Sequence, residues 1–76
     1  NDEKYALIGL YANKENFFLI TNLNSKLNEK YEGISKIYFD ETYNSSINID
    51  FGGYENSMTE VLNSIKVFSK VFLEVI

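Results

Sequence analysis

Hydrophobic packing alone must hold this chain of 76 residues together, because the chain contains neither Cys nor His. Disulfides and structural zinc sites of the usual kind are therefore excluded. The length lies close to the lower limit at which a single core supports itself. Hydrophobic residues make up 45% of the chain, which favours a folded domain over disorder. We expect one domain over residues 1–76, excised from a longer chain and stabilised further by oligomerisation.

The chain also contains no Arg, and these absences restrict the chemistry it can perform. Without His, Cys and Arg, it lacks the usual acid/base groups, thiolates and bidentate clamps. We therefore predict no enzymatic activity, no catalytic residue, no metal and no cofactor. The seven Lys are dispersed in a chain of net charge −4, which argues against nucleic-acid binding. No apolar run is long enough to span a membrane and no signal peptide is present, so we predict a cytoplasmic protein.

The segment over residues 5–12 predicts a β-strand with two apolar faces. Tyr5, Leu7 and Tyr11 alternate with Ala6, Ile8 and Leu10. Such a strand is typical of the centre of a sheet or of a strand covered on both sides. Gly9 within it indicates a close approach by another backbone or side chain.

A helix is predicted next, after the polar turn at residues 13–16. Its apolar positions recur every four residues from Leu19 to Tyr31, and Asn13 or Asn16 can cap its start. Gly33 supplies the left-handed residue that often ends a helix. Two alternating segments follow, at residues 34–42 and 47–51, separated by a turn signal at residues 43–46. They predict an antiparallel hairpin with one buried and one solvated face.

A second helix is expected from about Ser57, after the break at Gly52 and Gly53, with Asn56 or Ser57 as its cap. Two interpretations of residues 67–76 remain open. The β-branched and aromatic content favours a final strand. The polar residues Asn63, Lys66, Lys70 and Glu74 share one helical face, which favours one long helix.

With a final strand, the order of elements is β-α-β-β-α-β, typical of a ferredoxin-like α+β sandwich. That fold has a four-stranded antiparallel sheet with both helices on one face. The other face would be open, yet the first strand is apolar on both sides. Either the last strand, the loops or a second copy covers this patch, and on this basis we predict a homodimer.

The chain resembles the ACT regulatory-domain family, especially the ACT domains of prephenate dehydratases. Three stretches carry the resemblance: residues 5–14, residues 33–37, and residues 47–53 followed by 61–65 and the apolar end. The resemblance implies a non-catalytic module that dimerises and senses a small amino acid. Such a module would control an attached enzyme of amino-acid biosynthesis, with phenylalanine biosynthesis as one case.

The chain departs from the family in both segments that bind the effector. The family's Pro-Gly-Ala-Leu loop reads Glu15-Asn16-Phe17-Phe18 here, and its Glu-Ser-Arg-Pro segment reads Tyr38-Phe39-Asp40-Glu41. The Arg is missing, and a bulky Phe would fill the cleft. The alternative is therefore a ligand-free domain for protein–protein interaction or assembly.

The predicted ligand-binding site is the loop Asn13, Lys14, Glu15 and Asn16, of which Asn13 and Lys14 match the family. It would offer a carboxylate a helix N-terminus, two amides and an ammonium group. The competing interpretation is an ordinary capping loop.

Three other groups of residues each allow a functional and a plain structural interpretation. Asp40, Glu41, Asp50 and Glu55 would suit Mg²⁺ or Ca²⁺, but they also suit a solvated strand face. Gly52-Gly53 before a helix is compatible with a phosphate-binding turn or with a tight connection. The six Tyr residues would stack on bases only if basic residues surrounded them, so packing or interface contacts are favoured.

Overall fold

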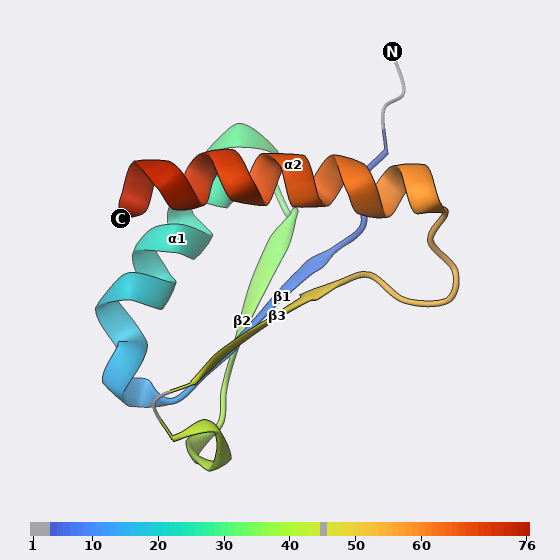
Figure 1. Cartoon of the computed structure of the whole chain (residues 1–76). Coiled ribbons are helices and arrows are strands. Elements are labelled where there is room, and N and C mark those ends of the chain that lie inside the picture. The colour runs from blue at the N-terminus through green and yellow to red at the C-terminus, as the bar shows by residue number, and fades with distance from the viewer. Residues whose placement is uncertain (1–3, 45) are drawn as a thin grey trace.

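The computed structural model describes residues 4–44 and 46–76 and shows an α+β fold of two helices on a mixed sheet (Figure 1). The strands are β1 (Ile8–Ala12), β2 (Ser35–Phe39) and β3 (Ile47–Phe51), and the helices are α1 (Phe17–Lys30) and α2 (Met58–Val75). Short 3₁₀ turns at Lys14–Asn16 and Glu41–Tyr43 join β1 to α1 and β2 to β3.

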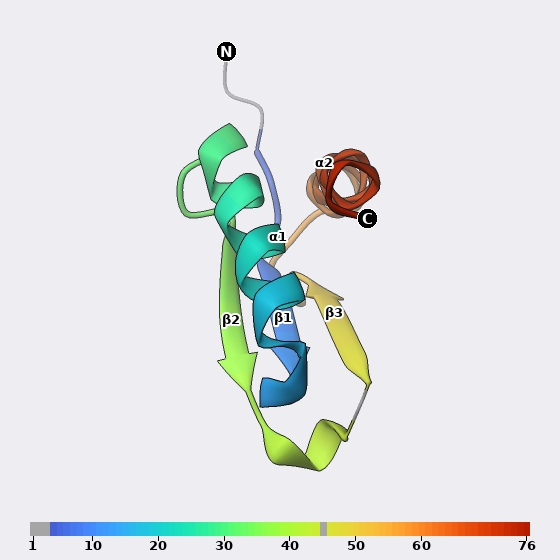
Figure 2. The ribbon, with the colours of Figure 1, turned by 90° about the vertical axis from the view of Figure 1, so that its left-hand side faces the viewer.

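Strand β1 lies at the centre of the sheet, in the order β2-β1-β3 (Figure 2). It pairs with β2 in parallel, with Ile8 opposite Ser35, and with β3 antiparallel, with Ile8 opposite Phe51. The central position expected for the doubly apolar segment is confirmed. The central strand hydrogen-bonds on both edges and is the least solvated, so the most apolar segment occupies it.

The predicted hairpin between β2 and β3 is wrong, and so is the four-stranded antiparallel ferredoxin-like sheet. The two segments lie on opposite edges of β1, and the 3₁₀ turn at Glu41–Tyr43 connects them across one end of the sheet (Figure 2). A split β-α-β arrangement would place another strand between the parallel pair, whereas β1 and β2 are direct neighbours. Alternation predicted the strands and their faces but carried no information on which strand each would pair with.

The predicted final strand over residues 67–76 is also wrong, because α2 continues to Val75. The side chain of Ser57 accepts a hydrogen bond from the Glu60 backbone, and the Glu60 side chain accepts one from the Ser57 backbone. This capping box starts a helix that meets no Gly or Pro before its end. The helical register buries Val67 and Val71, and this burial outweighs the β-propensity of the segment.

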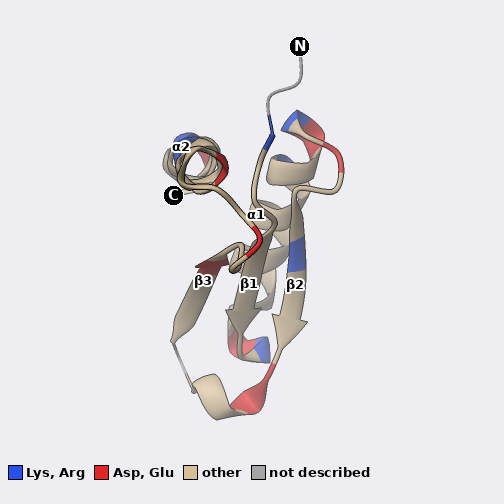
Figure 3. Ribbon diagram, turned by 90° about the vertical axis from the view of Figure 1, so that its right-hand side faces the viewer, with Lys and Arg blue, Asp and Glu red and all other residues tan. Residues whose placement is uncertain are grey.

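Both helices cover the same face of the sheet, as predicted. Ile8, Leu10 and Ala12 of β1 are fully buried beneath them. The helices contribute to the same core a set of buried apolar side chains: Ile20, Leu23 and Leu27 from α1, and Val67 and Val71 from α2. Figure 3, which views the molecule from the opposite direction to Figure 2, shows the strands in front of α1.

Hydrogen bonds from buried polar side chains dock each helix onto the sheet. On α2, the fully buried Ser64 hydroxyl donates to the carbonyl of Ala6. On α1, the Asn28 amide pairs with the backbone of Ser35, accepting from its N–H and donating to its carbonyl, both at 3.2 Å. Polar groups buried with partners fix the position of a helix without the cost of an unsatisfied donor or acceptor.

Two glycines adopt positive φ where the chain reverses. Gly33 lies in the turn after α1 with φ of 81°, which confirms its predicted left-handed conformation, whereas α1 itself ends at Lys30 with Tyr31 extended. Gly52 follows β3 with φ of 74°, and a Cβ there would lie 2.8 Å from the Cβ of Ala6. Glycine is therefore required at position 52 by the tight connection into α2.

Neither α1 nor α2 has the length and hydropathy that a membrane crossing needs, within the residues that the structure describes.

Candidate functional site

The predicted ligand loop, Asn13 to Asn16, forms a compact turn at the start of α1. The Asn13 side chain accepts a hydrogen bond from the Glu15 backbone at 2.9 Å and donates to the Glu41 carbonyl at 3.4 Å. Lys14 and Glu15 are exposed. The loop thus does what a capping loop does, and the Asn13 amide is committed to backbone groups. Its binding of a ligand stays a prediction.

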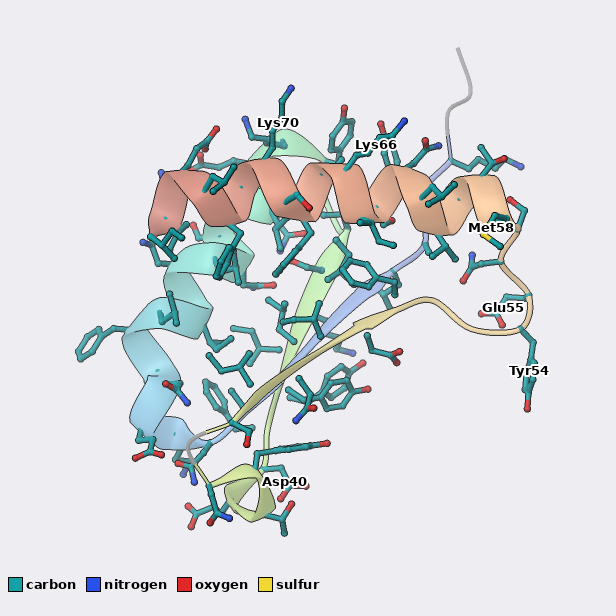
Figure 4. All side chains as sticks on the ribbon, in the orientation of Figure 1. Asp40, Tyr54, Glu55, Met58, Lys66 and Lys70 are labelled. Carbon is teal, nitrogen blue, oxygen red and sulfur yellow. The ribbon has the colours of Figure 1, made fainter. Side chains whose placement is uncertain are left out.

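The four carboxylates considered for a cation are dispersed. Asp40 caps the 3₁₀ turn after β2, accepting from the Thr42 backbone at 3.0 Å and from its hydroxyl at 2.9 Å. These bonds to Thr42 lower the pKa of Asp40 below its ordinary value. Figure 4 shows Asp40 and Glu55 at different ends of the sheet. Among the described residues, no group of three or more His, Cys, Asp or Glu is placed to hold a metal ion.

Three tyrosines partly cover the face of the sheet opposite the helices. The rings of Tyr11 and Tyr38 stack with centroids 4.7 Å apart, and Tyr43 approaches Tyr11 at 6.1 Å. Gly9 lies beneath the Tyr11 ring, since a Cβ at Gly9 would be 2.9 Å from Tyr11 Cε1. The close approach predicted from Gly9 is therefore made by a side chain of the same strand.

Tyr11, at the centre of this group, is poorly suited to proton transfer. Burial raises the pKa of Tyr11, and Tyr38, the Asp50 carboxylate and Tyr43 raise it further. Tyr11 therefore stays protonated at neutral pH. These ring contacts agree with the packing role favoured from the sequence, whereas Tyr54 projects away from the fold (Figure 4).

The largest feature that the sequence interpretation missed is an exposed apolar stripe along the outside of α2. It consists of residues separated by four, three, eight and three positions: Met58, Leu62, Ile65, Leu73 and Ile76. Met58 and Leu73 are 73% exposed and Ile76 is 72% exposed. At 100° per residue these side chains and Ser69 share one side of the helix, away from the buried Ser64, Val67 and Val71.

The stripe was detectable in principle from helical periodicity. Taken as one long helix, residues 58–76 carry apolar side chains on about two thirds of the helix surface, more than one sheet can cover. The interpretation of residues 67–76 as a strand divided this pattern in two and concealed it. Exposed apolar side chains gathered on one surface mark a place where another molecule binds.

Comparisons with known proteins identify no relative: no family model, curated protein or solved structure matches the chain. The resemblance to the ACT family therefore stays a prediction.

Proposed function

We propose that this domain is a non-catalytic regulatory and assembly module that forms a homodimer through the apolar stripe of α2. The observation that carries the proposal is the exposure of the stripe over the whole of α2. An 18-residue helix is about 27 Å long. Pairing two such helices buries a contact along that entire length.

The order of residues in the stripe favours a second copy of the chain as the partner. When two copies of α2 pack antiparallel, Met58 meets Ile76 of the other copy and Leu62 meets Leu73. Ile65 then meets Ser69, so the centre of the contact is its least apolar part. A two-fold interface needs a self-complementary surface of this kind. Tyrosines partly cover the second face of β1. The proposed dimer therefore forms through the exposed side of α2 instead of through that face.

The resemblance to the ACT family supports the regulatory part of the proposal. In this view the dimer controls an attached enzyme of amino-acid biosynthesis in response to a small amino acid bound near Asn13 and Lys14. Calorimetric titration with the common amino acids tests this part. Binding that weakens in Lys14→Gln supports it, and no binding at about 10 mM reduces the function to assembly alone.

Sedimentation equilibrium tests the dimer, with Leu62→Glu as the main variant and Thr59→Glu as its control. Both substitutions add one negative charge to an exposed position of α2, but only Leu62 belongs to the stripe. We expect Leu62→Glu to weaken dimerisation at least tenfold, because it places a charge inside an apolar contact, which costs about 1.4 kcal/mol or more. A wild-type chain that stays monomeric at about 1 mM would contradict the proposal.

A further inference from the structure

A groove of about 810 Å³ runs between α2 and the end of α1. Its walls come from three parts of the chain: the segment before β1, the last turn of α1 and the solvent side of α2. Sites for small molecules usually have volumes of 300–1,000 Å³ and combine an apolar lining with a few polar groups. The volume of the groove falls in that range. None of its lining residues belongs to the Asn13–Asn16 loop.

The charge around this groove is opposite to that of the chain. Three lysines line it, Lys30, Lys66 and Lys70, and no Asp or Glu is among its described lining residues. The chain as a whole carries 11 acidic residues against seven Lys. Folding therefore gathers three of the seven lysines that the sequence suggested were dispersed. Figure 3 shows the result as blue segments on α2 and at the end of α1.

Lys66 and Lys70 have positive charges that are available to bind an anion. Lys30 forms an ion pair with Glu74 at 3.6 Å. Lys66 and Lys70 have no ion-pair partner within residues 4–44 and 46–76. They lie one turn apart on α2, and Figure 4 shows both on its outer side. Two ammonium groups at this spacing can bind one anion together.

Aromatic and aliphatic side chains form the rest of the lining. The rings of Tyr5 and Tyr31 lie with centroids 4.5 Å apart and planes tilted by 39°. Ile65, Val67 and Leu73 of α2 complete the apolar part. A flat ring placed against tyrosine rings gains both apolar burial and favourable ring contacts.

We propose that this groove binds a small aromatic anion, meaning a flat ring that carries a carboxylate, sulfonate or phosphate group. The anionic group is held by Lys66 and Lys70, and the ring lies against Tyr5, Tyr31 and the apolar side chains of α2. Affinity depends on both halves of the ligand, because exposed lysines alone hold an anion weakly. It also falls as salt is raised, since the ammonium groups face solvent.

Titration followed by ¹H–¹⁵N NMR tests the ligand class, with 2-naphthoate as the probe. The neutral 2-naphthamide and inorganic phosphate are the matched controls for the ring and for the charge. We expect saturable shifts around Tyr31 and Lys70 with naphthoate, and binding at least tenfold weaker with either control. Equal binding of naphthoate and naphthamide would overturn the role of the lysines, and no saturable binding of naphthoate would overturn the site.

Charge-matched variants test the position of the site. Lys66→Gln with Lys70→Gln should weaken naphthoate binding about tenfold or more. Lys26→Gln with Lys36→Gln removes the same charge from a partly exposed site on α1 and an exposed site on β2, outside the groove, and should leave binding nearly unchanged. Equal loss in the two double variants would mean a non-specific effect of net charge. Loss confined to Lys14→Gln would place the anion at the Asn13–Asn16 loop instead and overturn the proposal.

The same titration in Leu62→Glu separates this site from dimerisation. Leu62 belongs to the apolar stripe but does not line the groove. Ile65 and Leu73 belong to both surfaces, so a dimer through the stripe covers one side of the groove. We therefore expect the monomeric variant to bind naphthoate at least as tightly as the wild type. Binding with a monomeric wild-type chain would refute only the dimer, and a wild-type dimer whose Leu62→Glu variant binds no naphthoate would refute only the ligand site.

Discussion

The two helices pack against the same face of one sheet, but they differ in what they leave exposed. Helix α1 buries Ile20, Leu23 and Leu27, and beyond its first turn the rest of its surface is mainly polar. Helix α2 buries Ser64, Val67 and Val71, yet its opposite side still presents the apolar stripe to solvent. Apolar content that the domain's own core does not use is therefore concentrated on one of its two helices.

This difference separates residues that the fold needs from residues that a partner would need. Burying a side chain such as Leu27 stabilises the domain itself. Leaving Leu73 exposed contributes little to folding, and in the proposed dimer its side chain would instead contact the second copy. Substitutions that compare equivalent side chains on the two helices test this distinction directly.

The largest expected effect comes from truncating a leucine on each helix. Leu27→Ala should lower the free energy of unfolding by about 2–5 kcal/mol, because it opens a cavity at a fully buried position of α1. Leu73→Ala should cost less than about 0.5 kcal/mol in dilute solution, since its side chain is already exposed. Urea unfolding at low protein concentration measures both. Similar losses for the two variants would show that the stripe serves the fold.

A smaller effect is expected from the two serines on opposite sides of α2. Ser64→Ala leaves the buried carbonyl of Ala6 without its hydroxyl donor, which should cost about 1–3 kcal/mol. Ser69→Ala removes an exposed hydroxyl at the middle of the stripe and should be neutral in the monomer or strengthen dimerisation. Thermal unfolding at several protein concentrations distinguishes these results. A neutral Ser64→Ala would mean that the hydroxyl does not dock α2 to the sheet.

The smallest expected effect is a loss of stability at acidic pH. Of the two helices, only α2 has an acidic residue, Glu60, in its first turn. Hydrogen bonds from the Ser57 backbone and the Asn56 amide lower the pKa of Glu60 below its ordinary value of 4.5. The unfolded state therefore takes up the proton first, so this stabilisation is complete above pH 4.5 and is lost as the pH falls below it. Glu60→Gln should lose less stability between pH 6 and about 3 than the wild type. Identical pH profiles would contradict the capping role of the carboxylate.

Local features of the fold were predictable from the sequence. The pairing of the strands and the continuation of α2 to Val75 were not. The alternation of Ile47, Ile49 and Phe51 correctly predicted a strand with one buried face, and Gly33 correctly predicted a left-handed residue after a helix. Which strands pair depends on contacts between distant segments, and the pattern of β2 fits either neighbour equally well. The final segment was misread because β-branched residues such as Val67 and Val71 are compatible with both structures. The polar face of Asn63, Lys66, Lys70 and Glu74 favoured one long helix, and the capping box at Ser57 and Glu60 is a second signal for it.

The candidate surfaces were less predictable than the fold. The stripe depends on recognising residues 58–76 as one helix, and the groove depends on Lys30 meeting Lys66 and Lys70 across the space between α1 and α2. Lys30 lies far from the other two in the sequence, so only the packing of the helices reveals the cluster. The Asn13–Asn16 loop was easier to predict as a site because its polar residues are consecutive in the sequence. In the structure, the Asn13 side chain caps the 3₁₀ turn before α1.

The central position of β1 also sets the order in which the sheet can assemble. Strands β2 and β3 each pair with β1 and not with each other, so neither can enter the sheet before β1 is in place. The unit from β1 through α1 to β2 needs only residues 8–39, and β3 and α2 follow it in the chain. Contacts close in sequence form faster than distant ones. A fragment that begins after Ala12 would therefore retain both outer strands and have no sheet to place them in.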